Sequence, residues 1–336
     1  MSRVFVAYTG GTIGMLPGED GFEPKAGEFL QLFNSLDFLG DPEVPEFEIE
    51  EFSPILDSAN MRPDDWNRIA LIIKEKYRDF DGFVILHGTD TMAYTASALS
   101  FMLEGLRKPV ILTGSQIPLC RTRSDAHRNV VEAMMFAGHY SIPEVCIYFG
   151  GRLIRGNRAT KVSSSALKAF DSPNFPQLGR VGTKFQLRDD LIRRSPHGAL
   201  NVLSLGRSKV GALRLFPGME AEILENMLRP PLEGLVLECY GAGNAPVKDG
   251  KIPAVIEAAN ERGVVVAISS QCPDGTVDLS GYATSSALAR AGAIGGLDMT
   301  VEAMMTKMMY LIDLGIPADQ VKHRMQIDLR GELSIS

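Results

Sequence analysis

Cysteine is scarce in this 336-residue sequence, and the four cysteines lie far apart. They form no closely spaced pair, so their pattern supports neither a zinc site nor a disulfide framework. We expect four reduced thiols in a reducing compartment, each acting as a small buried hydrophobic side chain: Cys120, Cys146, Cys239 and Cys272.

Long hydrophobic runs are also lacking. No stretch approaches the roughly 20 apolar residues that a helix needs to span a bilayer. The first residues lack the basic region, long apolar segment and small-residue cleavage site of a signal peptide. We therefore expect a cytoplasmic protein with no membrane partner.

Charge of one sign is not concentrated anywhere along the chain. The formal net charge is −7, whereas phosphate binding needs a clustered basic surface, so we expect no nucleic-acid partner. Hydrophobic residues make up 45% of the sequence and charged residues 22%, which is typical of a globular protein.

What the sequence does contain is a repeated alternation of short apolar runs with segments of helical periodicity. Continuous apolar strands are covered on both faces, so the pattern predicts an α/β fold with a mostly parallel sheet. In the first half, strands are expected within residues 3–8, 83–86, 109–118 and 144–151, and helices over 64–78, 92–106 and 125–138.

The alternation breaks down between residues 156 and 209, where prolines and glycines indicate loops with room for a hairpin. It returns near residue 210. We predict a larger N-terminal catalytic domain over 1–190, a linker over 191–209 and a smaller C-terminal α/β domain over 210–336. In the latter, strands are expected within 211–217, 233–239 and 263–272, and helices near 219–228, 250–261, 283–291 and 300–314.

Three polar turns follow strands of the first half: "TGGT", "HGTDT" and "TGSQIP". Right-handed crossovers place the carboxyl ends of parallel strands at one edge of the sheet, which is where open α/β sheets bind ligands. We expect these three turns to meet at that edge.

The first of these turns resembles a phosphate cradle only superficially. Gly10, Gly11 and Gly14 do not have the G-x-G-x-x-G spacing, and no lysine follows as in a P-loop. Adjacent glycines allow another backbone or a ligand to approach Thr12 closely. Thr12 either stiffens the turn or contacts a ligand, and the turn alone favours the first reading.

The second turn combines an imidazole, a hydroxyl and a carboxylate. His87 could be a general base in a Thr12–His87–Asp90 triad, but a histidine three residues before its aspartate has poor geometry. We favour a hydrogen-bonded structural histidine. For Thr91 we expect a helix cap, and for Asp90 capping and catalysis are compatible.

Other candidate residues are ambiguous by themselves. Lys161, in "RGNRATK", would be an ordinary exposed lysine unless it is buried beside a threonine and a carboxylate, where it could exchange a proton with a hydroxyl. Asp57 and Ser58 fit an N-cap or an anchor for an amino acid. Asn244, in "GAGNAP", fits an ordinary loop or a ligand contact.

The pair "TGGTIG" and "HGTDTM" resembles the two signatures of the L-asparaginase family, amidohydrolases that convert asparagine to aspartate and ammonia. The likeness continues through "DSANM", "LTGSQIP", "RSDAHRN", "RGNRATK", "YGAGNAP" and "DLRGEL", over essentially the whole chain. It is greatest to the bacterial cytoplasmic type I enzymes. It implies two α/β domains and an L-asparagine substrate, with L-glutamine used weakly at most.

The resemblance also implies roles for individual residues. Thr12 matches the family nucleophile, Thr89 and Asp90 the second threonine and its carboxylate, and Lys161 the lysine joined to them. Matches to substrate-binding positions are Gly11, Asp57, Ser58 and Asn244, the last contributed by a neighbouring chain. The family assembles as a homotetramer of tight dimers and uses no metal or organic cofactor.

The sequence departs from the family at one place. The loop after the nucleophile often carries a tyrosine, whereas "GEDGFEPKAG" has Phe22 and no tyrosine. Tyr310 is one candidate for that role, and activation by Lys161 or water is the alternative. Some relatives have a regulatory asparagine site, for which the candidate residues here are Thr160, Tyr240 and Cys272.

Two other functions remain open from sequence. Archaeal glutamyl-tRNA amidotransferases contain an asparaginase-like subunit, although those carry an additional N-terminal domain, and the acidic net charge disfavours tRNA. A non-catalytic nucleotide or ligand binder would use the glycine turn merely as a cradle.

Overall fold

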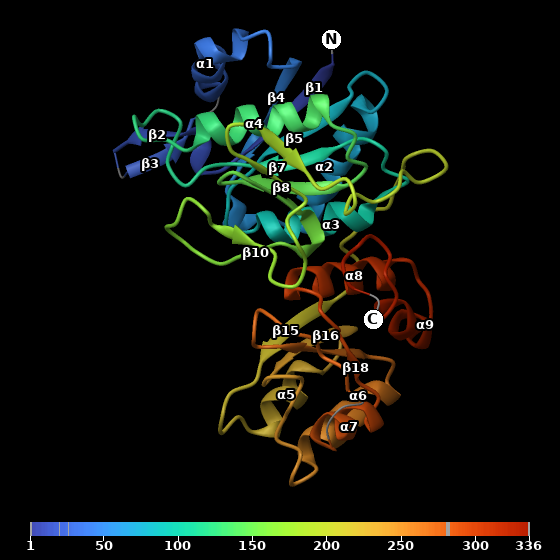
Figure 1. The fold of residues 1–336 in the computed structure, drawn as a ribbon. Helices are drawn as coiled ribbons and strands as arrows, with labels where there is room; N and C mark the ends of the chain where they lie inside the picture. The colour runs from blue at the N-terminus through green and yellow to red at the C-terminus, as the bar shows by residue number, and fades with distance from the viewer. Residues whose placement is uncertain (1, 20, 26, 280–282, 335–336) are drawn as a thin grey trace. The chain divides into compact units, whose positions relative to one another are not determined.

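The structure is a computed structural model, and it describes residues 2–19, 21–25, 27–279 and 283–334. The chain divides into two compact units, Met1–Leu203 and Ser204–Ser336, each with its own main sheet and hydrophobic core (Figure 1). The division falls within the stretch predicted as a linker, whose bounds stay a prediction.

The N-terminal unit is built on one eight-stranded sheet. Its strands are β1 (Arg3–Gly10), β4 (Glu46–Leu56), β5 (Gly82–Leu86), β7 (Val110–Thr113), β8 (Val145–Phe149), β9 (Arg152–Arg155), β12 (Gly179–Val181) and β13 (Phe185–Leu187). Their order across the sheet is β13-β12-β9-β8-β7-β5-β1-β4. The five strands from β8 to β4 run parallel, and β9, β12 and β13 join antiparallel. The expected α/β fold is confirmed.

Helices cover both faces of this sheet. Among the described residues, the α-helices of this unit are α1 (Glu28–Asn34), α2 (Pro63–Lys76), α3 (Met92–Met102) and α4 (Ala126–His139). Helix α4 packs on one face, and α3 packs on the other with α2 beside it (Figure 1). Alternate residues of β1, Val4, Val6 and Tyr8, face the core shared with α4 and α1.

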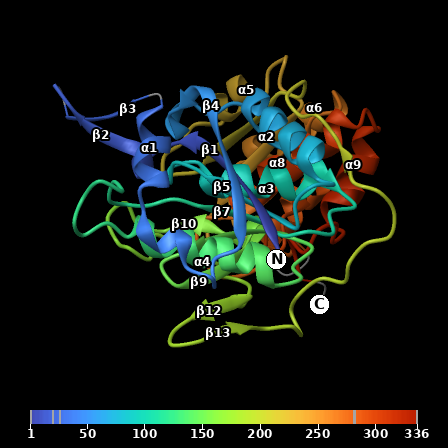
Figure 2. The same ribbon diagram turned by 90° about the horizontal axis from the view of Figure 1, so that it is seen from above.

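Three two-stranded pairs complete the N-terminal unit. They are β2 (Met15–Gly18) with β3 (Gly21–Pro24), β6 (Leu103–Glu104) with β14 (Asn201–Val202), and β10 (Thr160–Lys161) with β11 (Phe170–Asp171). Figure 2 shows the β2–β3 hairpin beside α1. The hairpin expected between residues 156 and 209 is confirmed as β12–β13.

Some elements differ from the sequence-based expectation. Strand β4, helix α1 and the β2–β3 hairpin are not among the predicted elements. The predicted helix 92–106 ends at Met102 because Leu103 and Glu104 pair with β14 and Gly105 follows at φ +74°. Pairing with a segment about a hundred residues away therefore overrides the local helical pattern.

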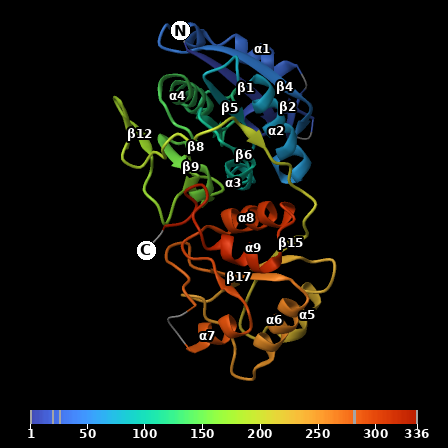
Figure 3. The same cartoon turned by 90° about the vertical axis from the view of Figure 1, so that its right-hand side faces the viewer.

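The C-terminal unit is a four-stranded parallel sheet between two layers of helices (Figure 3). In order across the sheet its strands are β15 (Val210–Arg214), β16 (Gly234–Cys239), β17 (Val265–Ser270) and β18 (Ile294–Gly295). The helices of one layer are α5 (Ala221–Met227), α6 (Lys251–Glu261) and α7 (Ala283–Arg290), and those of the other are α8 (Val301–Asp313) and α9 (Ala318–Met325). Helix α9 was not predicted.

The cysteines fit the expectation only in part. All four are free thiols, as predicted. Cys146 and Cys239 are buried in the two cores, but Cys120 and Cys272 are exposed, so the prediction of burial is wrong for those two. Cys120 lies in the turn between β7 and α4, and Cys272 lies in the loop that follows β17. Within the described ranges, no helix is long and apolar enough to cross a membrane.

Candidate active site

Two glycines bring the "TGGT" and "HGTDT" turns into direct contact. A Cβ atom added to Gly11 would lie 2.3 Å from the Cα atom of Gly88, a distance that no side chain tolerates. Gly11 also has φ +92°, which strongly favours glycine. The residues after these two glycines are Thr12 and Thr89, so the backbone contact brings the two candidate threonine segments together.

A third loop joins the same cluster. A Cβ atom on Gly88 would lie 2.3 Å from the Oγ atom of Ser58, which is buried. The neighbouring Asp57 accepts a hydrogen bond from the backbone N–H of Ala59 at 3.0 Å and thereby caps the short 3-10 turn Ser58–Asn60. The capping role expected of Asp57 is confirmed, and its side chain is exposed beside the cluster.

Thr91 corrects the sequence-based reading of its turn. It occupies the N-cap position of α3, but its side chain makes no capping hydrogen bond. Its hydroxyl instead donates to the carbonyl oxygen of Ser58 at 2.8 Å. The close approach of the two loops gives the Thr91 hydroxyl a carbonyl to which it can donate, and this bond joins "HGTDT" to "DSANM".

Lys161 reaches this cluster from the β10–β11 pair, where it lies opposite Phe170. Its Nζ atom donates to Thr89 Oγ1 at 2.9 Å and to Asp90 Oδ1 at 2.6 Å. The Lys161 side chain is 19% exposed, whereas that of Asp90 is 63% exposed. Lys161 is therefore no free surface lysine: it bonds directly to the hydroxyl and the carboxylate with which sequence analysis grouped it.

Gln116 is a member of the cluster that sequence reasoning missed. Its side-chain oxygen lies 3.5 Å from the hydroxyl of Thr89, and its amide nitrogen donates to the carbonyl of Ala166 at 3.2 Å. The Asp125 carboxylate accepts the backbone N–H groups of Gln116 and Ile117 at 3.0–3.1 Å and fixes this turn. The polar turn "TGSQIP" at the sheet edge was the available signal.

His87 has the structural role that sequence analysis favoured. The Gly88 carbonyl can only accept, so His87 Nδ1 carries the proton and donates to it at 2.7 Å. In the neutral ring Nε2 is then the acceptor, and it receives the Thr95 hydroxyl at 2.9 Å, while Trp66 Nε1 donates to Thr95 Oγ1 at 3.0 Å. Burial lowers the pKa of His87 to about 4, so the ring is neutral. Both nitrogens are used, and neither bonds to Thr12 or Asp90.

The remaining candidates are described by their own local contacts. Thr160 precedes Lys161 and pairs with Asp171. In the C-terminal unit, Tyr240 and Asn244 form an isolated bridge, and the Asn244 side-chain oxygen accepts from the Thr284 hydroxyl at 2.5 Å. The exposed Cys272 donates its backbone N–H to Ser270 Oγ at 2.9 Å.

The segment after Thr12, in which the family often carries a tyrosine, contains one exposed aromatic ring here. Phe22, in β3, is 43% exposed, and the guanidinium of Arg121 lies 5.7 Å from its ring centroid. Tyr310, the candidate substitute, is a buried residue of α8 in the C-terminal unit.

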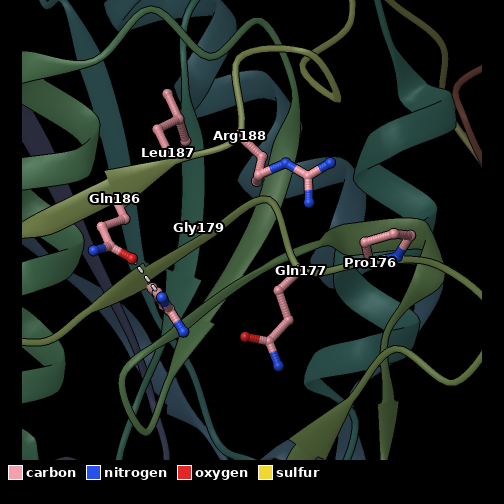
Figure 4. Close-up of a pocket in the computed structure, with 7 residues that line it drawn as sticks. Pro176, Gln177, Gly179, Gln186, Leu187 and Arg188 are labelled. Atoms are coloured by element: carbon pink, nitrogen blue, oxygen red, sulfur yellow. Dashed lines mark hydrogen bonds between the residues drawn. The ribbon is translucent and has the colours of Figure 1, made fainter.

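The turn cluster shows no metal-binding arrangement. Among the described residues, no group of three or more His, Cys, Asp or Glu side chains could hold a metal ion. A cavity of about 460 Å³ lies elsewhere in the N-terminal unit, over the β12–β13 hairpin (Figure 4). Its Arg180 donates to Gln186 at 2.6 Å, and its Arg188 forms a two-pronged ion pair with Asp190. No residue of the three turns lines it.

Comparison with known proteins matches both units. The family model described as Asparaginase, N-terminal matches residues 3–193, and the one described as Glutaminase/Asparaginase C-terminal domain matches residues 209–325. L-asparaginase 1 of Escherichia coli (strain K12) is 47% identical over 333 residues, which cover 98% of this chain and 98% of that protein.

Solved structures agree with the sequence matches. The L-asparaginase I of Vibrio cholerae superposes with a TM-score of 0.93 at 42% identity, over 99% of each chain. The thermostable L-asparaginase of Thermococcus kodakarensis gives a TM-score of 0.90 at 34% identity, over 99% of this chain and 100% of that one.

Proposed function

The chain belongs to the asparaginase family, and we propose that it hydrolyses the side-chain amide of L-asparagine to give L-aspartate and ammonia. The family resemblance drawn from the sequence is confirmed. The enzyme is an amidohydrolase, and its substrate is a small molecule. Thr12, Thr89, Asp90 and Lys161 are the residues to which we assign the chemistry.

The observation that carries the proposal is the bonding of Lys161 to both Thr89 and Asp90, beside the Gly11–Gly88 contact. A lysine that bonds to both a hydroxyl and a carboxylate can carry a proton between them. The glycine contact places the Thr12 segment against that group. We therefore assign the nucleophile to the first turn, and the acid–base groups to the second turn together with Lys161 of β10.

The first step forms an ester on Thr12. Its Oγ atom attacks the side-chain amide carbon, the C–N bond breaks, and the leaving nitrogen takes a proton and departs as ammonia. Covalent catalysis suits amide hydrolysis because it divides one difficult step into two. The developing oxyanion needs fixed donors, for which we propose backbone N–H groups of the two turns.

The second step releases aspartate. A water molecule attacks the ester carbon and its proton returns to the Thr12 oxygen as that oxygen leaves. The transfer runs through Thr89, Lys161 and Asp90, and each of these groups gives up one proton as it takes one. The carboxylate of Asp90 holds the Lys161 ammonium beside the hydroxyl. Positioned acid–base groups of this kind contribute about 10²–10⁴-fold.

Substrate selection is assigned to the loops around the cluster. Ser58 lies against Gly88, and the exposed Asp57 precedes it. We assign to this pair the α-amino and α-carboxylate groups of the substrate. Gly11 allows the substrate carbonyl to approach Thr12. We propose asparagine as the main substrate and glutamine, which is one methylene longer, as a weak one. No cofactor is part of the proposal.

Three further proposals concern the assembly of the protein, its location in the cell and its regulation. We propose a cytoplasmic homotetramer built as a dimer of dimers, in which Asn244 of a neighbouring chain completes the site. A second asparagine site near Thr160, Tyr240 and Cys272 would regulate activity. A strictly hyperbolic dependence of rate on asparagine would count against that second site, and a native mass of one chain would exclude the assembly.

Ammonia release measured over a concentration series of asparagine and of glutamine tests the function. We expect release with asparagine, without any nucleotide, and a much smaller kcat/KM with glutamine. A protein that binds nucleotide and releases no ammonia would be a binder instead. Retardation of tRNA in a gel would favour the amidotransferase subunit.

A further inference from the structure

Glu51 is a carboxylate that follows two apolar residues on one face of β4. Side chains alternate along a strand, so Glu51 shares its face with Phe47 and Ile49, both of which pack on the main core. In the register between the strands, Val4 lies opposite Phe47, Val6 opposite Ile49 and Tyr8 opposite Glu51. The strand pairing thus sets a carboxylate beside a fully buried phenol.

Neither of these polar groups is fully bonded in this arrangement. Tyr8 is 0% exposed, and its hydroxyl has no hydrogen-bond partner among the described residues. The Oε2 atom of Glu51 is buried and likewise lacks a partner in the described part of the chain. Burial, and then the charge of Glu51, raise the pKa of Tyr8 far above its ordinary value, so its hydroxyl is a donor.

Each of the two residues also contacts one end of the segment that follows Thr12: Tyr8 contacts Gly14, and Glu51 contacts Gly27. A Cβ atom added to Gly14 would lie 2.0 Å from the Tyr8 hydroxyl. The phenol therefore packs directly against the Thr12–Gly14 turn. The other Glu51 oxygen accepts the backbone N–H of Gly27 at 2.8 Å, where α1 begins. Along the chain, strands β2 and β3 lie between these two glycines.

A donor and an acceptor left unbonded side by side call for a physical explanation, because an unsatisfied buried polar group is costly. The ring of Tyr8 is held by Phe29, whose centroid lies 3.8 Å away. The Glu51 carboxylate accepts from Gly27 through its other oxygen, and its charge acts on the Tyr8 hydroxyl from the neighbouring strand. A bond between them would couple the Thr12 turn to the start of α1.

We propose that Tyr8 and Glu51 are positioning residues for Thr12. A hydrogen bond from the Tyr8 hydroxyl to Glu51 Oε2, unmade in the arrangement described here, forms when the Thr12 turn engages asparagine. The inference rests on the proposed function. It states that the pair contributes to the affinity for substrate and not to the rate of the chemical step.

Tyr8→Phe tests this, with Tyr148→Phe as the matched control. Tyr148 is another buried tyrosine of the same core, but its hydroxyl donates to the Glu132 carboxylate. We expect Tyr8→Phe to keep or raise the thermal unfolding midpoint, because it removes an unbonded hydroxyl, and Tyr148→Phe to lower it. Loss of one hydrogen bond corresponds to a KM raised about two- to tenfold. That rise is expected for Tyr8→Phe alone, with kcat nearly unchanged.

A second variant checks that the two residues act together. Tyr8→Phe combined with Glu51→Gln should raise KM no further than Tyr8→Phe does, because both remove the same bond. A lowered midpoint or an unchanged KM in Tyr8→Phe would overturn the inference. If the wild-type protein releases no ammonia, the proposed function fails and this inference with it. An active wild type with an unaffected Tyr8→Phe variant overturns this inference alone.

Discussion

The ammonium nitrogen of Lys161 lies 2.9 Å from the hydroxyl oxygen of Thr89, although 72 residues separate them along the chain. Because the lysine donates, the hydroxyl oxygen is the acceptor and its own hydrogen is left to point elsewhere. The nearest acceptor recorded for it, Gln116 Oε1, lies at 3.5 Å, the limit of a hydrogen bond. The Thr89 hydroxyl is therefore available to a substrate or a water molecule.

Replacing Lys161 by methionine should remove turnover and leave the fold intact. Methionine keeps most of the aliphatic length but cannot donate to Thr89 or carry a proton. We expect kcat to fall by about 10²–10⁴-fold. Lys168→Met is the control, because this lysine is exposed in the same loop region. Steady-state ammonia release and circular dichroism make the comparison, and full activity in Lys161→Met would remove the proton-transfer role.

The two threonines should fail at different steps. Thr12→Ala removes the attacking oxygen, so no ammonia should be released, even in the first turnover. Thr89→Val keeps the nucleophile but impairs attack by water, so we expect one equivalent of ammonia per site in a burst and then slow turnover. Rapid-quench ammonia measurement separates the two. If both variants gave a burst of ammonia, or if neither did, the assignment of the first step to Thr12 and the second to Thr89 would be wrong.

Gly88→Ala tests the packing that holds the turns together. Its Cβ would collide with Ser58, and the resulting shift should cost about 1–3 kcal/mol of unfolding free energy together with most of the activity. Gly182→Ala is the matched control, since its Cβ meets no atom within 4 Å. Urea unfolding and kcat/KM should both distinguish the variants. Equal effects would mean that the contact is unimportant.

The lowered pKa of His87 predicts that the folded protein loses stability in acid. Its pKa is lowered from 6.5 to about 4 in the folded protein, so between these values the unfolded chain binds a proton that the folded protein does not. Stability contributed by the neutral ring is therefore present above pH 6.5 and lost as the pH falls toward 4, by about 3 kcal/mol.

Urea unfolding at about pH 7.5 and about pH 4.5 measures this effect. The difference between the two pH values should shrink in His87→Gln and stay unchanged in His197→Gln, whose histidine is exposed. Because each variant is compared with itself at the two pH values, the packing cost of the substitution cancels. A pH-dependent loss as large in His87→Gln as in the wild type would contradict the assignment.

Local patterns made the α/β architecture predictable. Apolar strands such as Gly82–Leu86 are buried along their whole length, and the glycine turns after them are encoded within a few residues. Strand β4 was missed because its exposed face carries Glu46, Glu48 and Glu50, which dilute the apolar signal at the edge of the sheet. Its regular alternation was nevertheless present in "EFEIE".

The candidate site was less predictable because its contacts are not local. Residue types alone left Lys161 as an ordinary surface lysine, and only the family resemblance grouped it with Thr89. Its approach depends on the β10–β11 pair, which returns the chain to the sheet edge. Gln116 and the Thr91–Ser58 bond depend in the same way on three turns from distant parts of the sequence.

The most direct test of the central claim is mass spectrometry of Thr89→Val protein quenched shortly after mixing with asparagine. The account predicts an aspartyl ester on the peptide that contains Thr12, and no such ester in the Thr12→Ala, Thr89→Val double variant. An ester on any other residue, or asparagine turnover that never yields an ester on Thr12, would contradict it.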